Sequence, residues 1–231
     1  MPSDNNRKMR EWPSLGQYGG MTTLRHALAA LVIVLAAPLV ADARARPAEG
    51  IDALRLSAEL ARQGRQRHDP WLLATAARLR RETPVQASPR TPEAAPGDSA
   101  PFDPAAAWLD EAERMGAADP RLMSLVAEVR AFAFRGRTGG PKVSTARLGA
   151  GGVHRYGESF DPSQPAVVYV EGDGDSDLLL TVRDAAGGQA CAEMGPGDIK
   201  ICSWTPRASG AYRIEITNRG VVDDRYAVAT N

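Results

Sequence analysis

Apolar residues recur at helical spacing along the first half of the chain that follows residue 45. Four of them share one face of a first helix: Ile51, Leu54, Ala58 and Ala61. We expect this helix to end at Gly64. An Asp-Pro pair at 69–70 then begins a second helix, because aspartate caps free N–H groups and proline suits the first helical turn.

The same arrangement returns further along the chain. A third helix is expected from Pro104 to Gly116, and a fourth begins at the Asp-Pro pair at 119–120. Residues 46–135 therefore predict a small helical domain of two hairpins, packed as four helices. The hairpins are separated by residues 83–103, TPVQASPRTPEAAPGDSAPFD, whose prolines predict a mobile loop.

Two tryptophans, Trp71 and Trp108, lie on the apolar faces of these helices. A pair of indole rings could stack on a ligand. Aromatic residues at helical spacing more often pack inside the protein, however, and we therefore interpret both as core residues.

The spacing of apolar residues changes to a period of two after a linker at 136–145. Three rows alternate in this way: Val168 and Val170; Leu178, Leu180 and Val182; Tyr212, Ile214 and Ile216. Glycine-rich turns separate the rows. Short alternating strands joined by such turns predict an antiparallel β-sandwich or jelly roll over residues 146–231, so the chain is expected to be a two-domain protein, α then β.

The N-terminal region carries the pattern of a secretory signal peptide. Arg25 and His26 precede an uninterrupted apolar run at 27–40, and small residues follow, so cleavage would come after Ala43 or Ala45. A retained membrane anchor is the alternative, but the run is shorter than the roughly 20 residues that a span needs. We therefore expect export to the periplasm or the exterior, with no stable membrane span after cleavage.

The first 20 residues are polar and show no apolar pattern. They are interpreted as an over-extended start, with Met1 and Met21 as alternative sites of translation initiation. Residues 1–45, the start and the signal peptide together, are left out of the predicted fold.

Composition excludes one class of partner. The 231 residues are 43% hydrophobic and 24% charged, and the formal net charge is zero. Because the chain has no excess of basic residues, no nucleic-acid partner is expected.

Export determines how the two cysteines, Cys191 and Cys202, are interpreted. An oxidising compartment favours a disulfide between them. A metal site would need two further ligands, and the histidines of the mature part, His68 and His154, lie far away in the sequence. The loop at 195–198 joins the strands expected to carry the cysteines, so we predict a bridge between neighbouring strands.

Three stretches in the C-terminal third occur in a familiar order: PAVVYVEGDGDSDLLLTVRDAAGGQ, CSWTPRASGAYRIEITNRG and RYAVATN. Together they resemble the bacterial pre-peptidase C-terminal domain over about residues 150–231. The resemblance rests on the Gly-Asp-Gly-Asp-x-Asp-Leu entry to a strand, a Trp-Thr-Pro turn and a Gly-x-Tyr strand start. It implies a secreted, non-catalytic β-sandwich that in some members binds polymeric substrates or calcium. Relatives often keep a carboxylate where this chain has Leu179, and the helical half is not recognised.

Three aspartates at alternate positions, Asp173, Asp175 and Asp177, precede a strand. In an EF-hand loop that begins at Asp173, Asp184 would be the twelfth residue. Residues 178–183 alternate as a strand, however, which at about 3.3 Å per residue carries Asp184 about 20 Å away from Asp177. We therefore favour a solvated acidic turn, expect no cofactor, and keep a calcium site at the three aspartates as the alternative.

The sequence contains no placed pair of nucleophile and base and no phosphate-binding motif. His154 is interpreted as a surface or edge histidine. We therefore expect no catalytic residues and no enzymatic activity.

These observations favour an exported, non-catalytic binding or scaffold protein of unknown ligand. The helical part would offer a face to a protein partner. Two alternatives are an accessory or targeting subunit of a secreted, peptidase-associated hydrolase and a calcium-binding adhesion module.

Overall fold

The computed structural model describes residues 46–88, 90–93, 102–132 and 139–231. The predicted signal peptide, its cleavage sites at Ala43 and Ala45 and residues 136–138 of the predicted linker lie outside these ranges. Within them, no helix is long and apolar enough to cross a membrane. The described helices and strands belong to one compact unit, so the two parts that the sequence predicts as separate domains are packed together.

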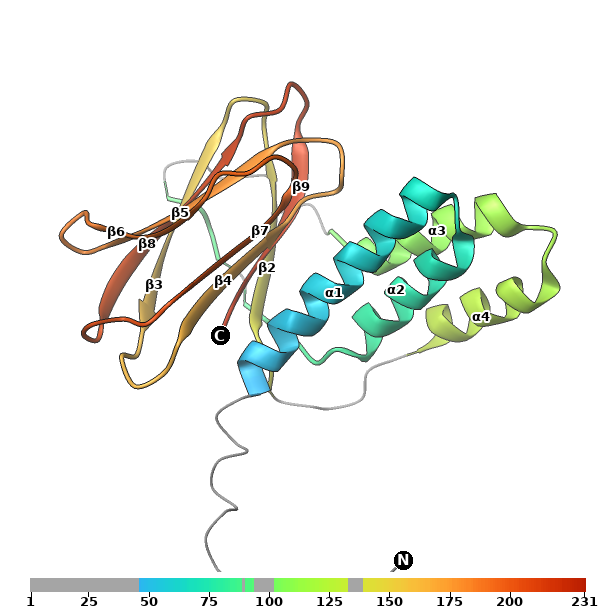
Figure 1. The fold of residues 1–231 in the computed structure, drawn as a ribbon, viewed down its shortest axis with the longest axis horizontal. Coiled ribbons are helices and arrows are strands. Elements are labelled where there is room, and N and C mark those ends of the chain that lie inside the picture. Colours follow the sequence, from blue (N-terminus) through green and yellow to red (C-terminus); the bar gives the residue numbers. More distant parts are fainter. Residues whose placement is uncertain (1–45, 89, 94–101, 133–138) are drawn as a thin grey trace, which may run out of the picture. The chain divides into compact units, whose positions relative to one another are not determined.

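Four helices follow one another along the described chain (Figure 1). They are α1 (Arg46–Arg67), α2 (Pro70–Glu82), α3 (Pro104–Gly116) and α4 (Pro120–Ala131). The last three begin at Asp-Pro pairs, where Asp69, Asp103 and Asp119 accept hydrogen bonds of 2.9, 3.2 and 2.9 Å from backbone N–H groups of the first turn. The four predicted helices are confirmed, and local capping decides where α2, α3 and α4 begin.

The first helix does not end where the sequence predicts. α1 continues past Gly64 to Arg67, and His68 then turns the chain with a φ of 51°. A Cβ atom at position 64 would lie 3.0 Å from the Leu73 Cγ. Gly64 therefore serves the close approach of α2 to α1 and is not a stop signal.

The helices share an apolar core that contains Trp108 but not Trp71. Trp108 is buried in this core, as predicted. Trp71 is 42% exposed, so its assignment to the core is wrong. It lies in the first turn of α2, whose inward side is formed by Leu73 and three alanines further along the helix.

The second half of the chain forms two sheets that face each other (Figure 1). One sheet has five strands in the order β1-β2-β9-β4-β7, and the other has four in the order β3-β8-β5-β6. The bounds are β1 (Gln86–Ala87), β2 (Lys142–Leu148), β3 (Val153–Phe160), β4 (Ala166–Glu171), β5 (Leu178–Asp184), β6 (Gln189–Glu193), β7 (Ile199–Trp204), β8 (Gly210–Asn218) and β9 (Asp224–Thr230). The predicted antiparallel sheets are confirmed for β2 to β9, and β1 pairs with β2 in parallel.

The alternating rows predicted from the sequence form the core between the two sheets. Val168, Leu180, Ile214 and Val228 are completely buried there. The strand β2 begins earlier than the sequence pattern predicts. Residues 142–145, which the pattern assigns to the linker, belong to β2 and pair with β9.

The five-stranded sheet is covered on both faces. All six residues of β4 are buried. Those that point away from the sandwich core contact α1, where Ile51 and Leu54 pack against Tyr169 and Ala229. Part of the apolar face of the first helix is therefore occupied by this sheet and not by other helices.

Cys191 and Cys202 form the predicted disulfide. The cysteines lie on consecutive strands joined by the loop at 195–198, as predicted, but these strands belong to different sheets. Cys191 lies on β6 at the edge of the four-stranded sheet, and Cys202 lies on β7 at the edge of the five-stranded sheet. The disulfide therefore links the two sheets along one side of the sandwich.

The described part of the proline-rich segment closes the opposite side of the sandwich. We call residues 84–88 and 90–93 the strap. The Ser88 N–H donates to the Val143 carbonyl of β2 at 2.8 Å, and the Glu93 N–H donates to the Arg155 carbonyl of β3 at 2.7 Å. The prediction of a mobile loop is wrong for the strap, because its backbone is hydrogen-bonded to an edge of each sheet; residues 94–101 lie outside the described ranges.

Arg90 anchors the strap between the sheets. Its side chain is only 10% exposed, and its Nε lies 3.3 Å from the Glu158 Oε2. Its Nη2 donates to the Thr230 hydroxyl at 2.7 Å. Because a buried carboxylate needs a cationic or hydrogen-bonding partner, Arg90 couples the strap to the folded sandwich.

We expect Arg90→Ala to lower the free energy of unfolding by about 2 kcal/mol, because Glu158 would keep only the half-exposed Lys142 as a cationic partner and the bond to Thr230 would be lost. Urea-induced unfolding at pH 7 measures this change. Arg78→Ala is the control, since Arg78 is half exposed in its ion pair with Glu82 and its loss should cost much less than the loss of Arg90. Equal losses in the two variants would contradict the anchoring role of Arg90.

Candidate functional site

The helix-facing side of the five-stranded sheet carries two rows of cross-strand partners. One row consists of Thr145, Ala227 and Glu171. The other row consists of Val143, Ala229 and Tyr169. The central strand, β9, contributes only alanine to both rows, which leaves a hollow between larger side chains on β2 and β4.

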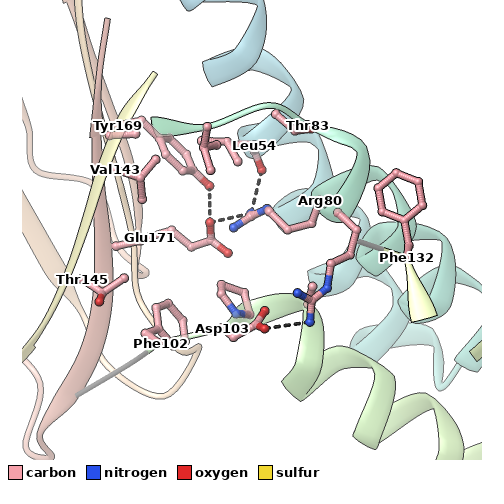
Figure 2. Close-up of a pocket in the computed structure, with 16 residues that line it drawn as sticks. Leu54, Arg80, Thr83, Phe102, Asp103, Phe132, Val143, Thr145, Tyr169 and Glu171 are labelled. Carbon is pink, nitrogen blue, oxygen red and sulfur yellow. Dashed lines mark hydrogen bonds and ion pairs between the residues drawn. The ribbon is translucent and has the colours of Figure 1, made fainter. Parts of the chain in front are cut away.

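A cavity of about 530 Å³ lies over this hollow, between the sheet and the helices. We call it the sheet cavity (Figure 2). Its other walls include Leu54 from α1, Phe102 just before α3 and Phe132 just after α4. Val85 and Phe132 line it and are each 42% exposed, so the apolar lining extends to the protein surface.

A buried ion pair forms the polar part of the cavity wall. The Arg80 Nη2 donates to the Glu171 Oε2 at 2.6 Å, and the Glu171 side chain is only 3% exposed. The Tyr169 hydroxyl donates to the same oxygen at 2.9 Å. Figure 2 shows these three side chains together at the junction of β4 and α2.

Arg80 also holds the helices to one another. Its Nε donates to the Ser57 hydroxyl at 2.8 Å, and its Nη2 donates to the Leu54 carbonyl at 3.0 Å, both in α1. Its guanidinium lies 4.9 Å from the centre of the Trp108 ring, in the range of a cation–π contact. One side chain thus joins α1, α2, α3 and the sheet.

The protonation of this group follows from its burial. Burial raises the pKa of Glu171, while the Arg80 guanidinium and the hydrogen bonds to Glu171 act in the opposite direction. Burial raises the pKa of Tyr169 well above its usual value, so its hydroxyl keeps its proton and serves as a donor. Glu171 is the acceptor for both neighbours.

Two polar atoms on the cavity wall are not used by the neighbouring side chains of the wall. Both donors to Glu171 contact Oε2, and none of the side chains drawn in Figure 2 donates to Oε1. Arg81 donates from Nη2 to the Asp103 Oδ2 at 2.7 Å, but its Nε is buried and has no partner. The sheet cavity is therefore an apolar space that contains an unused acceptor and an unused donor.

A second polar cluster lies beside the ends of β4 and β9. Carboxylate oxygens of Asp173, Asp175 and Asp224 lie within 4.8 Å of one another. Asp177, the third aspartate of the calcium alternative, lies instead 3.9 Å from the Arg219 Nε. Asp224 takes its place, because the antiparallel pairing of β4 with β9 brings the start of β9 beside the end of β4. As predicted, the strand β5 separates Asp184 from this cluster.

Asp224 is the buried member of the cluster. Its Oδ1 accepts a hydrogen bond from the Asp173 N–H at 3.1 Å, and its Oδ2 accepts one from the Ser176 hydroxyl at 2.5 Å. Burial nevertheless raises its pKa from 3.8 to about 7. Calcium takes roughly six to eight oxygens, so three carboxylates would need further ligands from the backbone or from water.

We expect the stability of the protein to fall as the pH rises from about 4 to 7, and to level off above pH 7. Because the folded-state pKa of Asp224 exceeds the unfolded value, the folded state binds its proton more tightly, and ionisation destabilises the fold. The loss is on the order of 4 kcal/mol, since each pKa unit corresponds to about 1.4 kcal/mol. Chemical denaturation at several pH values measures it.

Asp224→Asn should flatten this dependence, whereas the neighbouring Asp223→Asn should retain it, because Asp223 forms an exposed ion pair with Arg147. An unchanged slope in Asp224→Asn would contradict the assignment. The acidic-turn interpretation also expects a melting temperature that millimolar Ca²⁺ does not change. A rise that disappears in Asp224→Asn would instead support the calcium alternative.

His154 has a different environment from the one predicted. It lies on β3, an edge strand, but its side chain is buried, with 4% exposure. Its Nδ1 is hydrogen-bonded to the Tyr226 hydroxyl at 2.8 Å, and Tyr226 is in turn bonded to Tyr156. Burial lowers the pKa of His154. The expected edge strand is confirmed, but the surface position is wrong, because the His154 side chain faces the other sheet, where the Tyr226 hydroxyl supplies a polar partner.

Comparisons with known proteins give little beyond a weak likeness of fold. The chain matches no protein-family model, and no curated protein matches it. Its structure is similar to the pre-peptidase C-terminal domain of a Bacillus anthracis collagenase, with a TM-score of 0.33 and 11% identity over 39% of this chain and 89% of that one. The periplasmic g-type lysozyme inhibitor PliG of Aeromonas hydrophila gives a TM-score of 0.31 and 14% identity over 43% and 93%. A Cellvibrio mixtus carbohydrate-binding module in complex with cellotriose gives a TM-score of 0.23 and 12% identity over 42% of this chain and 89% of that one. Likenesses at this level carry no argument about function.

Proposed function

We propose that this protein is an exported, non-catalytic binding protein whose ligand occupies the sheet cavity. The observation that carries the proposal is the apolar cavity of about 530 Å³ beside a buried, paired carboxylate. Binding sites for small molecules have volumes of about 300–1,000 Å³ and combine apolar walls with a few polar groups. The sheet cavity has both properties.

The walls of the cavity support a binding role because they come from regular elements. Three strands supply one side, and the helices supply much of the other. The Arg80–Glu171 pair joins the two sides, so the cavity is formed before a ligand arrives. A site that is already formed loses less free energy in ordering its own groups on binding.

The charged groups around the cavity support binding over catalysis. Glu171 is paired with Arg80, and Asp103 is paired with Arg81, so each carboxylate already serves a neighbouring guanidinium. The disulfide between Cys191 and Cys202 supports export, because such bonds persist in oxidising compartments. The prediction that the helices offer a face to a protein partner does not depend on the sheet cavity and stays a prediction.

Filling the cavity should weaken ligand binding without unfolding the protein. We expect Ala227→Phe to weaken binding of the neutral fluorescent probe N-phenyl-1-naphthylamine by at least about tenfold, because the new ring would occupy the space above β9. Fluorescence titration of the purified protein measures the affinity, and thermal denaturation checks the fold.

Ala185→Phe is the matched control, because it adds the same ring to the exposed turn after β5. This variant should bind the probe like the wild-type protein. Failure of the wild-type protein to bind any apolar probe, or equal binding by the folded Ala227→Phe variant, would contradict the proposed site.

A further inference from the structure

We propose that the sheet cavity selects apolar molecules that carry a hydrogen-bond donor, such as a hydroxyl or an amine, and rejects the same molecules when they carry a carboxylate. This inference rests on the proposed function, because it names the ligand class of the same cavity. It follows from the position and pairing of Glu171.

Glu171 presents an acceptor that the protein itself does not use. Its side chain is only 3% exposed, and Arg80 and Tyr169 both donate to Oε2, whereas none of the cavity residues drawn in Figure 2 donates to Oε1. Buried polar atoms in native proteins nearly always have a hydrogen-bond partner. Because Glu171 lines the cavity, a donor group on a ligand can supply that partner.

The space for such a ligand lies directly beside Glu171 in the sheet. Ala227 is its cross-strand partner on β9, and Thr145 is the next residue in the same row on β2. The small Ala227 side chain leaves the carboxylate accessible from the middle of the cavity. Figure 2 shows Glu171 on the sheet side of this space and Asp103 on the helix side.

The charges in the cavity disfavour an anionic ligand. The Arg80 charge is balanced by Glu171, and its Nε and Nη2 donate to Ser57, the Leu54 carbonyl and Glu171. Arg81 is paired with Asp103. A carboxylate that entered here would meet Glu171 without a spare cation to balance it, and like charges in a partly desolvated site repel strongly.

The remaining residues of the cavity wall favour a ligand whose main part is apolar. Val143 and Thr145 border the hollow on the sheet side, and Phe102 and Phe132 border it on the helix side. On such a ligand a hydroxyl can donate to Glu171, whereas an ionised carboxylate has no proton to donate. An aromatic or aliphatic alcohol therefore fits the polar groups of this cavity better than a carboxylic acid of equal size.

The test compares three ligands that share one ring system: 2-naphthalenemethanol, 2-methylnaphthalene and 2-naphthoate. Their affinities for the purified protein are measured at pH 7.5 by competition with N-phenyl-1-naphthylamine. We expect the alcohol to bind about tenfold to a hundredfold more tightly than the carboxylate, the range that a hydrogen bond to a charged group provides. The methyl compound should lie between them.

Glu171→Gln should reverse this order. The variant removes the negative charge and leaves the Arg80 guanidinium unbalanced, so the carboxylate should gain at least about tenfold relative to the alcohol. Glu82→Gln is the control, since it removes one negative charge from an exposed helix pair and should keep the wild-type order. The wild-type comparison needs no variant and therefore decides the question even where Glu171→Gln does not fold.

The outcomes separate this inference from the proposed function. Equal affinities of the wild-type protein for the alcohol and the carboxylate, with both lost in Ala227→Phe, would overturn the donor preference and leave the binding cavity in place. A folded Glu171→Gln variant with the wild-type order would overturn the role of Glu171. No binding of any of the three ligands would overturn the proposed function itself.

Discussion

The buried pair of Arg80 and Glu171 is the interaction on which the arrangement of helices and sheet depends. A buried charge is costly unless an opposite charge and hydrogen bonds satisfy it. Arg80 comes from α2 and Glu171 from the end of β4, so each part of the chain carries a group that only the other part can neutralise. The helices therefore dock on the sheet in one position, in which the guanidinium also reaches Ser57 and Trp108.

The same pair explains why a cavity exists. Its two long side chains occupy the junction of α2 and β4, while the adjacent strand β9 places only the small side chains of Ala227 and Ala229 beside the cavity. Larger apolar side chains at those two positions would fill the space, as Ile51 and Leu54 do over Tyr169. The combination of a polar junction with a column of alanines produces a hollow in an interface that would otherwise be closely packed.

Sequence patterns predicted the parts of the fold that depend on near neighbours. Asp69 and Asp119 cap helices through atoms two residues away, and the alternation at Leu178 and Leu180 follows from the geometry of a strand. One further sequence pattern indicates how the sheet is covered. The continuous apolar run of β4, which begins at Ala166, is typical of a strand that is covered on both faces and so indicated that helices lie against the sheet. The role of Gly64 could not be predicted, because a glycine that allows close packing looks the same in a sequence as one that ends a helix.

The candidate site could not be predicted for a different reason. Arg80 and Glu171 are 91 residues apart, and Asp224 lies beside Asp173 only through strand pairing, so neither contact has a local sequence pattern.

The strap has a consequence for how the protein meets other molecules of its own kind. The margins of open sheets carry unpaired N–H and C=O groups, which allow strands of different molecules to join and begin aggregation. In this sandwich the segment between α2 and α3 supplies backbone partners to β2 and to β3 along one margin, at Val143 and Arg155. A segment with the composition of a linker thus covers these strand edges, so that a strand of another molecule cannot pair with them.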